Sequence, residues 1–252
     1  MTALEPGTCV VGDLHLDVSL GAPPPQAFLD WLEGLRGAPR LIVLGDLFDA
    51  WIGPRHLELP AAAAAVAGLR ALADSGTRVE LLLGNRDFLM EREFERASGA
   101  RVHAGGLLGA LPDGSRALFV HGDELCTLDV GYQRLKRFVR SRGFRWAAHH
   151  QPRAMSLWVA RRLRAGSRRA VPRKPAAHTA QQPDAALALA REAGAQHLVC
   201  GHAHRFRREP LAGGPTWWVL DAWGDARDLL RVRAGAEGPF EVTSSGAGAG
   251  AA

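Results

Sequence analysis

Short apolar runs alternate with longer amphipathic stretches along most of this 252-residue chain. Four apolar runs have the length and composition of buried strands: residues 8–13, 40–44, 79–83 and 197–200. Four stretches place apolar side chains at helical spacing: residues 26–35, 60–73, 91–97 and 183–193. Because parallel strands are joined by crossover helices, this alternation predicts an α/β protein with a mostly parallel sheet.

Two further patterns predict that the sheet becomes mixed. The turn sequence Pro112-Asp113-Gly114-Ser115 separates apolar runs at residues 107–108 and 117–120, which predicts a β-hairpin. Residues 216–220 and 229–232 have the composition of closing antiparallel strands. The expected fold class is therefore α/β, with mixed strands flanked by helices.

The segment between residues 129 and 176 interrupts the alternation. It holds helical stretches at residues 132–139 and 155–163 but no strand-like run that ends in a glycine turn. We interpret it as a helical insert on a strand scaffold. The expected organisation has four parts: core residues 1–128, insert residues 129–176, core residues 177–243, and a Gly/Ala/Ser tail at residues 244–252 that we expect to be disordered.

The formal net charge of +5 conceals a separation of charge along the chain. Of the 31 Lys and Arg residues, 14 lie between residues 134 and 174, which contain no Asp or Glu. The rest of the chain carries 17 basic and 26 acidic residues. An acidic body with one cationic segment could attract a nucleic acid, an anionic membrane surface or a phosphorylated ligand.

The lack of recognisable targeting signals and the pattern of isolated cysteines lead us to expect a cytoplasmic protein. No run of about 20 apolar residues occurs, so we expect no membrane-spanning helix. The N-terminus lacks a basic region followed by an apolar stretch, so we expect no signal peptide. Cys9, Cys126 and Cys200 are isolated and lie beside apolar residues, as is typical of reduced thiols near a core.

Five apolar runs end in a glycine turn that carries Asp, Asn or His. The turns are Gly12-Asp13-Leu14-His15, Gly45-Asp46, Gly84-Asn85-Arg86-Asp87, His121-Gly122-Asp123 and Gly201-His202-Ala203-His204. Open α/β sheets place their chemistry at the C-terminal ends of the strands. We therefore expect these turns to meet at one edge of the sheet.

The side chains of these turns suit metal binding when they are considered together. Each alone has a structural explanation as a helix cap, a turn residue or a histidine at a strand end. Carboxylate, imidazole and amide groups suit Mn²⁺, Fe²⁺ or Zn²⁺. Seven ligands are too many for one ion and suit two ions that share a carboxylate, an arrangement that promotes in-line displacement at phosphorus. The seven are Asp13, His15, Asp46, Asn85, His121, His202 and His204.

The five blocks, in this order, resemble the calcineurin-like metallophosphoesterase superfamily. That resemblance implies a mixed β-sheet sandwich flanked by helices and a centre of two divalent ions, for which we expect Mn²⁺. By the same resemblance, Asp46 would bridge the two ions. One ion would be held by Asp13, His15 and His204, and the other by Asn85, His121 and His202.

One position narrows the resemblance to a subgroup. Most superfamily members have His after the Asn of the third block, and this chain has Arg86. With the sequences at residues 46–53, 84–89 and 121–127, this resembles the UDP-2,3-diacylglucosamine pyrophosphohydrolase family of lipid A biosynthesis. The resemblance implies hydrolysis to UMP and 2,3-diacylglucosamine 1-phosphate. Its catalytic residues would be Asp46, Asn85, Arg86 and His121.

The same resemblance gives the insert the role of a lid over the acyl chains of the substrate. It places the substrate against Asn85, Arg86, Asp129, Tyr132, Arg164, Ser167, Lys174 and His202. A family position that is usually Asn is Val171 here, so one polar contact is lost. We also expect Asp49 and Asp87 to orient ligands or Arg86, and Asp123 to orient the His121 loop.

The composition of the insert independently suits an amphiphilic ligand. Large apolar residues lie among its basic residues: Phe138, Val139, Phe144, Trp146, Met155, Leu157, Trp158 and Val159. Packing on the body accounts for some of them. The mixture also suits a ligand with a charged head and fatty tails, and peripheral binding to anionic lipid. With the family resemblance, it implies a cytoplasmic protein bound peripherally to the inner face of the inner membrane. We expect a monomer.

Three other functions compete with this interpretation. The same metal centre could act on another nucleotide diphosphate conjugate or phosphodiester, but a small soluble substrate gives no reason for the apolar insert. A nucleic-acid-binding protein would use the cationic segment electrostatically, but leaves the five turns unexplained. An inert scaffold is disfavoured because all seven ligand types are present. We expect no nucleic-acid partner.

Overall fold

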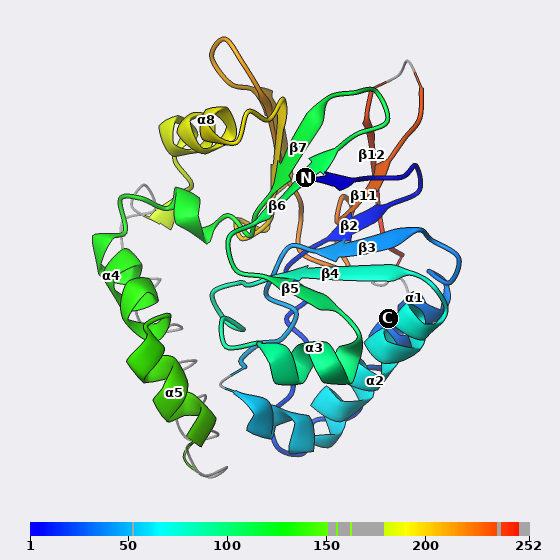
Figure 1. Ribbon diagram of the computed structural model, residues 1–252, viewed down its shortest axis with the longest axis vertical. Coiled ribbons are helices and arrows are strands. Elements are labelled where there is room, and N and C mark those ends of the chain that lie inside the picture. Colours follow the sequence, from blue (N-terminus) through cyan, green and yellow to red (C-terminus); the bar gives the residue numbers. More distant parts are fainter. Residues whose placement is uncertain (52, 151–154, 156–161, 163–178, 236–237, 247–252) are drawn as a thin grey trace.

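The computed structural model describes residues 1–51, 53–150, 155, 162, 179–235 and 238–246, which form two six-stranded sheets (Figure 1). In spatial order, the first sheet contains β1 (Thr2–Ala3), β6 (Leu107–Ala110), β7 (Arg116–Phe119), β8 (His197–Cys200), β10 (Thr216–Val219) and β9 (Arg207–Pro210). The second contains β12 (Phe240–Thr243), β11 (Leu229–Val232), β2 (Cys9–Val11), β3 (Arg40–Val43), β4 (Arg78–Leu82) and β5 (Arg101–His103).

Helices cover the outer faces of both sheets (Figure 1). The α-helices are α1 (Gln26–Glu33), α2 (Pro60–Asp74), α3 (Arg92–Ser98), α4 (Val130–Val139), α5 (Arg142–His150) and α8 (Pro183–Glu192). Two short 3₁₀ helices, η1 (Pro54–Glu58) and η2 (Asp123–Leu125), follow β3 and β7 in the chain. No helix in the described ranges is both long and apolar enough to cross a membrane.

Three apolar clusters show how the layers are stacked. Along β2, Val10 belongs to the cluster between the sheets, whereas Cys9 and Val11 belong to the cluster under α1, α2 and α3. The third cluster joins β8 to α8, where Ala186 and Ala190 are fully buried. Strands buried on both faces need a continuous apolar sequence, which is why β2, β3 and β8 are so clear in the sequence.

The structure confirms the predicted hairpin and the main helices, with shifts of one or two residues at several ends. Leu107 pairs with Phe119 in the antiparallel β6–β7 ladder, as the turn sequence predicts. The strands divide between two mixed sheets, which confirms the mixed sandwich implied by the family resemblance; the alternation of strands and helices alone does not reveal this division. The two closing strands also separate. β10 lies parallel to β8 and antiparallel to β9, whereas β11 is antiparallel to β2 and β12 in the other sheet.

The insert begins with two helices that run beside the body (left in Figure 1). Helix α4 matches the predicted stretch, and α5 is a second helix that we did not predict. Helix α5 contacts the body through the buried Ala148, whose carbonyl oxygen approaches Gly53, and through Arg145, whose Nε lies 2.5 Å from Glu91 Oε1. Of the predicted helix at residues 155–163, only Met155 and Arg162 lie within the described residues.

A buried ionic network joins the two sheets. The guanidinium of Arg40, 2% exposed, donates to Glu80 and, over 3.3 Å, to the carbonyl oxygen of Ala3 in β1. His103 Nε2 lies 2.7 Å from the other oxygen of Glu80. Burial alone would raise the pKa of Glu80, but His103 and Arg40 hold it below its usual value. The ionised carboxylate therefore stabilises the fold above the ordinary carboxyl pKa, and this contribution is lost as pH falls through the folded-state pKa.

Glu80→Ala is expected to lower the free energy of unfolding by about 3 kcal/mol, because it removes the nearer carboxylate partner of the buried Arg40 and leaves only Glu5, 3.7 Å away. Urea unfolding measures the change. Glu33→Ala is the matched control, since it removes an ion pair with Arg36 in which both side chains are at least half exposed. Its midpoint should not move. Equal midpoints for the two variants would contradict a structural role for the Arg40 network.

Candidate metal centre

The sheet topology brings the five predicted turns to one edge. Strands β2, β3 and β4 are mutually parallel, and so are β7 and β8, so each group releases its turns in one direction. The first ligand of every turn follows its strand within three residues. The first ligands are Asp13 after β2, Asp46 after β3, Asn85 after β4, His121 after β7 and His202 after β8.

The backbone of these turns is unusual. Five non-glycine residues in the described chain have positive φ, a region that side chains with a Cβ rarely adopt. All five are predicted metal ligands: Asp13 (54°), His15 (49°), Asp46 (50°), His202 (69°) and His204 (51°). Such conformations persist only where the surrounding structure enforces them, and they concentrate at functional sites.

Two glycines allow the carboxylates to approach the neighbouring backbone. A Cβ on Gly84 would lie 2.1 Å from Asp46 Oδ1, and a Cβ on Gly201 would lie 2.3 Å from Asp13 Oδ2. Neither position can therefore accept a side chain without displacing a predicted ligand. This proximity explains the glycines of the third and fifth sequence blocks.

Gly84→Ala is expected to lower kcat/KM about 100-fold, because the new methyl group displaces the Asp46 carboxylate by about an ångström or more. Steady-state kinetics with saturating Mn²⁺ measures the loss. Gly105→Ala is a suitable control, since a Cβ there meets no atom within 4 Å. Wild-type activity in the Gly84 variant would show that the tight approach is unnecessary.

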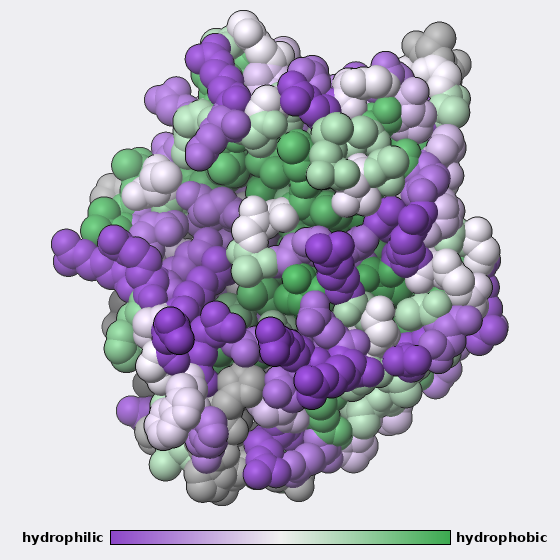
Figure 2. Space-filling view, viewed as in Figure 1, coloured by the Kyte–Doolittle hydropathy of each residue, from purple (hydrophilic) through white to green (hydrophobic). Residues whose placement is uncertain are grey.

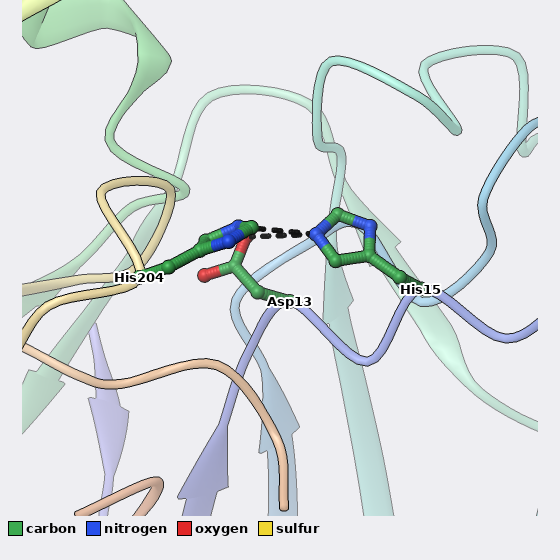
Figure 3. A group of neighbouring side chains, drawn as sticks. All are labelled: Asp13, His15 and His204. Atoms are coloured by element: carbon green, nitrogen blue, oxygen red, sulfur yellow. Dashed lines mark hydrogen bonds and ion pairs between the residues drawn. The ribbon is translucent and has the colours of Figure 1, made fainter. Parts of the chain in front are cut away.

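The first group of ligands consists of Asp13, His15 and His204 (Figure 3). His15 and His204 point toward one another, with their Nε2 atoms 3.1 Å apart. Asp13 Oδ1 lies 3.3 Å from His204 Nε2 and 3.9 Å from His15 Nε2, and this buried oxygen has no hydrogen-bond partner. Its other oxygen, Oδ2, accepts a 2.7 Å hydrogen bond from the backbone N–H of His202. An oxygen between two imidazole nitrogens fits a divalent cation.

The second group surrounds His121. Its Nδ1 is 2.8 Å from the carbonyl oxygen of Leu44, so Nδ1–H donates there and Nε2 faces the site. His121 Nε2 lies 3.0 Å from Asn85 Oδ1 and 3.7 Å from Asp46 Oδ1. The ring of His202 stands edge-on to that of His121, with 5.0 Å between centroids. Asp13, Asp46 and His121 also form a possible metal-binding group, which joins the second group to the first.

The pKa values of His15, His202 and Asp46 suit a bound cation. Burial lowers the pKa of His15 to about 3 and that of His202 to about 4, so both rings are neutral and can donate a lone pair at pH 7. Burial, together with the charges of Asp87 and Asp13, raises the pKa of Asp46 to about 7 despite the opposing effect of His121. A bound cation would offset the electrostatic repulsion between such buried carboxylates and so stabilise their ionised forms. Despite burial, the charges of Asp46 and Asp13 raise the pKa of His121 to about 9, so this ring must release a proton to bind a metal ion.

Arg86 lies at the border of the centre. Its backbone N–H donates to Asp46 Oδ1 over 2.9 Å, and its Nε lies 3.4 Å from Asp46 Oδ2. Asp49 Oδ1 lies 3.5 Å from Arg86 Nη1, so the structure places Asp49 where it can orient the guanidinium. Asp87 instead accepts the backbone N–H groups of Gly84 and Leu47, and so fixes the turns after β3 and β4.

Of the predicted substrate residues in the insert, the structure describes Asp129 and Tyr132 but not Arg164, Ser167 and Lys174. The Tyr132 hydroxyl donates to Asp123, and Lys136 Nζ lies 2.8 Å from Asp123 Oδ2, which fastens α4 to the His121 turn. Asp129 caps α4 by accepting the N–H of Tyr132 over 3.0 Å. Their substrate contacts remain predictions. Val171 lies outside the described residues as well.

Sequence reasoning missed Gln181. This buried side chain donates from Nε2 to the carbonyl oxygens of Gly122, over 3.2 Å, and Gly201, over 2.9 Å. It therefore joins the turn of His121 to the turn of His202. A glutamine outside any motif carries no signal of such a role, so only the three-dimensional contact reveals it.

Comparison with known proteins agrees with this geometry. A family model described as calcineurin-like phosphoesterase matches residues 8–206. The chain belongs to the calcineurin-like phosphoesterase family. UDP-2,3-diacylglucosamine hydrolase of Pseudomonas putida (strain W619) is 38% identical to this phosphoesterase over 197 residues, which are 78% of this chain and 81% of the relative. The enzyme of that name from Pseudomonas aeruginosa (strain UCBPP-PA14) is 36% identical over 209 residues, 80% and 83% of the two chains.

These relatives confirm the resemblance drawn from the sequence blocks and place this phosphoesterase beside the UDP-2,3-diacylglucosamine hydrolases. Among solved structures, vacuolar protein sorting 29 from Cryptosporidium parvum is 11% identical, with a TM-score of 0.45 and coverage of 94% of each chain.

Proposed function

We propose that this phosphoesterase hydrolyses the pyrophosphate bond of UDP-2,3-diacylglucosamine to give UMP and 2,3-diacylglucosamine 1-phosphate in lipid A biosynthesis. The observation that carries the proposal is a ligand set for two metal ions with Arg86 at its border and an insert, rich in exposed apolar and basic side chains, fastened beside it. The names of the relatives support the same substrate.

Two divalent ions, which we expect to be Mn²⁺, would be held by the seven ligand residues. Bound there, they would supply the Lewis acidity that activates a water molecule and neutralises phosphate charge. Asp46 would bridge the sites, and its position near both His15 and His121 supports this role. One site would use Asp13, His15 and His204, and the other Asn85, His121 and His202.

Arg86 would stabilise the charge that develops on the pyrophosphate. Its guanidinium presents a rigid set of donors suited to phosphate oxygens. Asp46 and Asp49 hold it at the edge of the centre, and the side chain is 35% exposed, so a substrate can reach it. Asp129 and Tyr132, with Arg164, Ser167 and Lys174, would complete the contacts to the glucosamine and acyl chains.

The insert presents an amphiphilic surface. Figure 2 shows hydrophilic and hydrophobic side chains intermixed where α4 and α5 lie. Most of the exposed large apolar residues of the described chain fall in or beside these helices: Leu128, Val130, Leu135, Phe138, Trp146 and Met155. Val139 and Ala148 are buried instead, so packing uses only part of the apolar set. Exposed apolar side chains among arginines suit the acyl chains of a lipid and an anionic membrane surface.

The double variant Phe138→Ala/Trp146→Ala is expected to raise KM for the diacyl substrate about 10-fold, because these side chains are 61% and 65% exposed and free to contact acyl chains. It should also weaken cosedimentation with vesicles of anionic phospholipid. Leu20→Ala, on the body and 59% exposed, is the control. An unchanged KM in the double variant would place the acyl chains elsewhere.

We further propose that the protein is a monomer in the cytoplasm, bound peripherally to the inner face of the inner membrane. The arginines of α4 and α5 alternate with exposed apolar residues, which favours a lipid surface over a nucleic acid. Flotation with vesicles at increasing salt, beside an electrophoretic mobility assay with duplex DNA, would separate the two partners.

A product assay tests the reaction directly. Purified protein is incubated with Mn²⁺ and UDP-2,3-diacylglucosamine in detergent, and the products are identified by mass spectrometry. UMP and the lipid 1-phosphate should form in the presence of Mn²⁺ and disappear with a chelator. Absence of turnover, alongside metal-dependent hydrolysis of bis-p-nitrophenyl phosphate, would reject this substrate and leave a phosphoesterase for another nucleotide conjugate or phosphodiester.

A further inference from the structure

A second rim of the metal centre lies opposite the insert. Strand β10 is parallel to β8, so the loop at residues 220–228 leaves the first sheet at the edge where His202 and His204 lie. The loop then enters β11, which pairs with β2 next to Asp13. It therefore connects the two sheets at the edge where the predicted metal ligands lie. Helix α5, by contrast, contacts Gly53 and Glu91, which follow β3 and β4 at the other side of the centre.

Phe206, Asp221 and Arg227 form a layered group on this second rim. Arg227 lies over the ring of Phe206, with its guanidinium carbon 4.5 Å from the ring centroid. Asp221 holds both, since Oδ1 accepts the N–H of Phe206 over 2.6 Å and Oδ2 lies 3.5 Å from Arg227 Nε. The Arg227 side chain is 55% exposed, whereas that of Asp221 is 11% exposed. One face of the Arg227 guanidinium therefore lies on the Phe206 ring, Asp221 fixes its orientation, and the rest of the group is open to solvent.

The loop that carries Arg227 is held in place by its own contacts. The backbone N–H of Asp221 donates to the carbonyl oxygen of Arg227, which closes the loop on itself. The fully buried Asp228 accepts the N–H of Gly224 over 2.6 Å. Trp223 packs edge-on against Trp31 of α1, with centroids 6.0 Å apart. A surface arranged before binding loses little conformational entropy when a ligand arrives.

Phe206 connects this group to the metal ligands along the chain. Phe206 follows His204 by two residues, which places its Cα within about 7 Å of the Cα of that ligand. A pyrophosphate diester extends in two directions from the phosphorus that is attacked. The diacylglucosamine half would lie toward the insert, so the nucleoside half would lie toward the opposite rim.

We propose that the exposed face of Arg227, backed by Phe206 and fixed by Asp221, is the stacking surface for the pyrimidine base of the substrate. Arginine planes and aromatic rings are common stacking partners for bases. The inference rests on the proposed function for its ligand, a uridine nucleotide. It adds a nucleoside site that is separate from the metal centre and from the insert.

Calorimetry with the Mn²⁺-loaded protein and two simple ligands tests the site. UMP and ribose 5-phosphate share a phosphate and a ribose, and only UMP carries a base. We expect wild-type protein to bind UMP about 10-fold more tightly. Arg227→Lys keeps the charge but removes the plane, and Phe206→Leu removes the support. Both should reduce the difference between the two ligands to less than about threefold while ribose 5-phosphate binds as before.

The control variant is Arg208→Ala, which removes another arginine stacked on an aromatic ring, that of Trp218, 4.6 Å away. It lies in the β9–β10 ladder instead of the rim loop and should retain the preference for UMP. Equal binding of UMP and ribose 5-phosphate by wild-type protein, or a full preference in both rim variants, would overturn the site. A preference for UMP without turnover of UDP-2,3-diacylglucosamine would support the nucleoside site and reject only the proposed lipid substrate.

Discussion

Asp46→Ala is expected to lose both metal ions and to reduce kcat/KM by at least about 1000-fold, since metal ions contribute several kcal/mol to transition-state stabilisation. Asp46 lies within 4 Å of an imidazole nitrogen in each group, that of His15 and that of His121, through different carboxylate oxygens. Metal content by mass spectrometry of the desalted protein, measured beside the rate, gives both quantities. Near wild-type activity would defeat the two-metal assignment.

The stability of the metal-free protein separates this effect from misfolding. Burial and neighbouring carboxylates raise the pKa of Asp46 to about 7 in the folded protein. Ionised Asp46 therefore lowers the free energy of unfolding once the pH exceeds the pKa that this residue has in the unfolded chain. This decrease grows as pH rises toward the folded-state pKa and is complete above it. We therefore expect Asp46→Ala without metal to unfold at a temperature no lower than wild-type protein at pH 8, although it is inactive. A large decrease would mean that the lost activity reports misfolding.

Arg86→Ala is expected to lower kcat about 100- to 1000-fold while both metal ions remain bound. Its guanidinium lies beside Asp46 and Asp49 without being a predicted ligand, so its removal deletes a stabilising charge and leaves the ligand set intact. Saturation kinetics and metal analysis on one preparation measure both effects. Loss of metal together with activity would assign Arg86 a structural role at the centre.

Arg86→Lys provides the matched comparison, because it keeps the charge and removes the two-pronged donor geometry. We expect it to recover only a small part of the lost rate. Full recovery would show that charge alone is needed at this position. Asp49→Asn should cause a smaller decrease than Arg86→Ala, since Asp49 acts by orienting the guanidinium.

The metal ligands could be predicted from sequence because they follow buried strands. A strand such as β2 or β8 is covered on both faces, so its sequence is a clear apolar run, and the turn after it is located at once. The structure brings together all seven predicted ligands at one edge. The pairing of the closing strands was not predictable, because nothing in the residues of β10 and β11 specifies which sheet each one joins.

The missed strands have a common physical cause. β1, β5, β9 and β12 are the outermost strands of the two sheets, so each pairs on one side only and is partly exposed. Their short, polar sequences, such as Arg207–Pro210 in β9, lack the apolar run that marks a central strand. Gln181 and the Asp123–Lys136 pair were also missed because their partners are distant in sequence or carry no motif.

At the five ligand positions with left-handed backbone, folding stability and metal binding favour different residues. Glycine is the residue that this backbone accepts most easily, whereas a metal ion requires the carboxylate or imidazole of Asp13, His15, Asp46, His202 or His204. A population of variants screened only for resistance to unfolding would accordingly accumulate glycine at these positions and lose the enzyme. Engineering a more durable form of this protein must therefore begin with these five residues excluded from change.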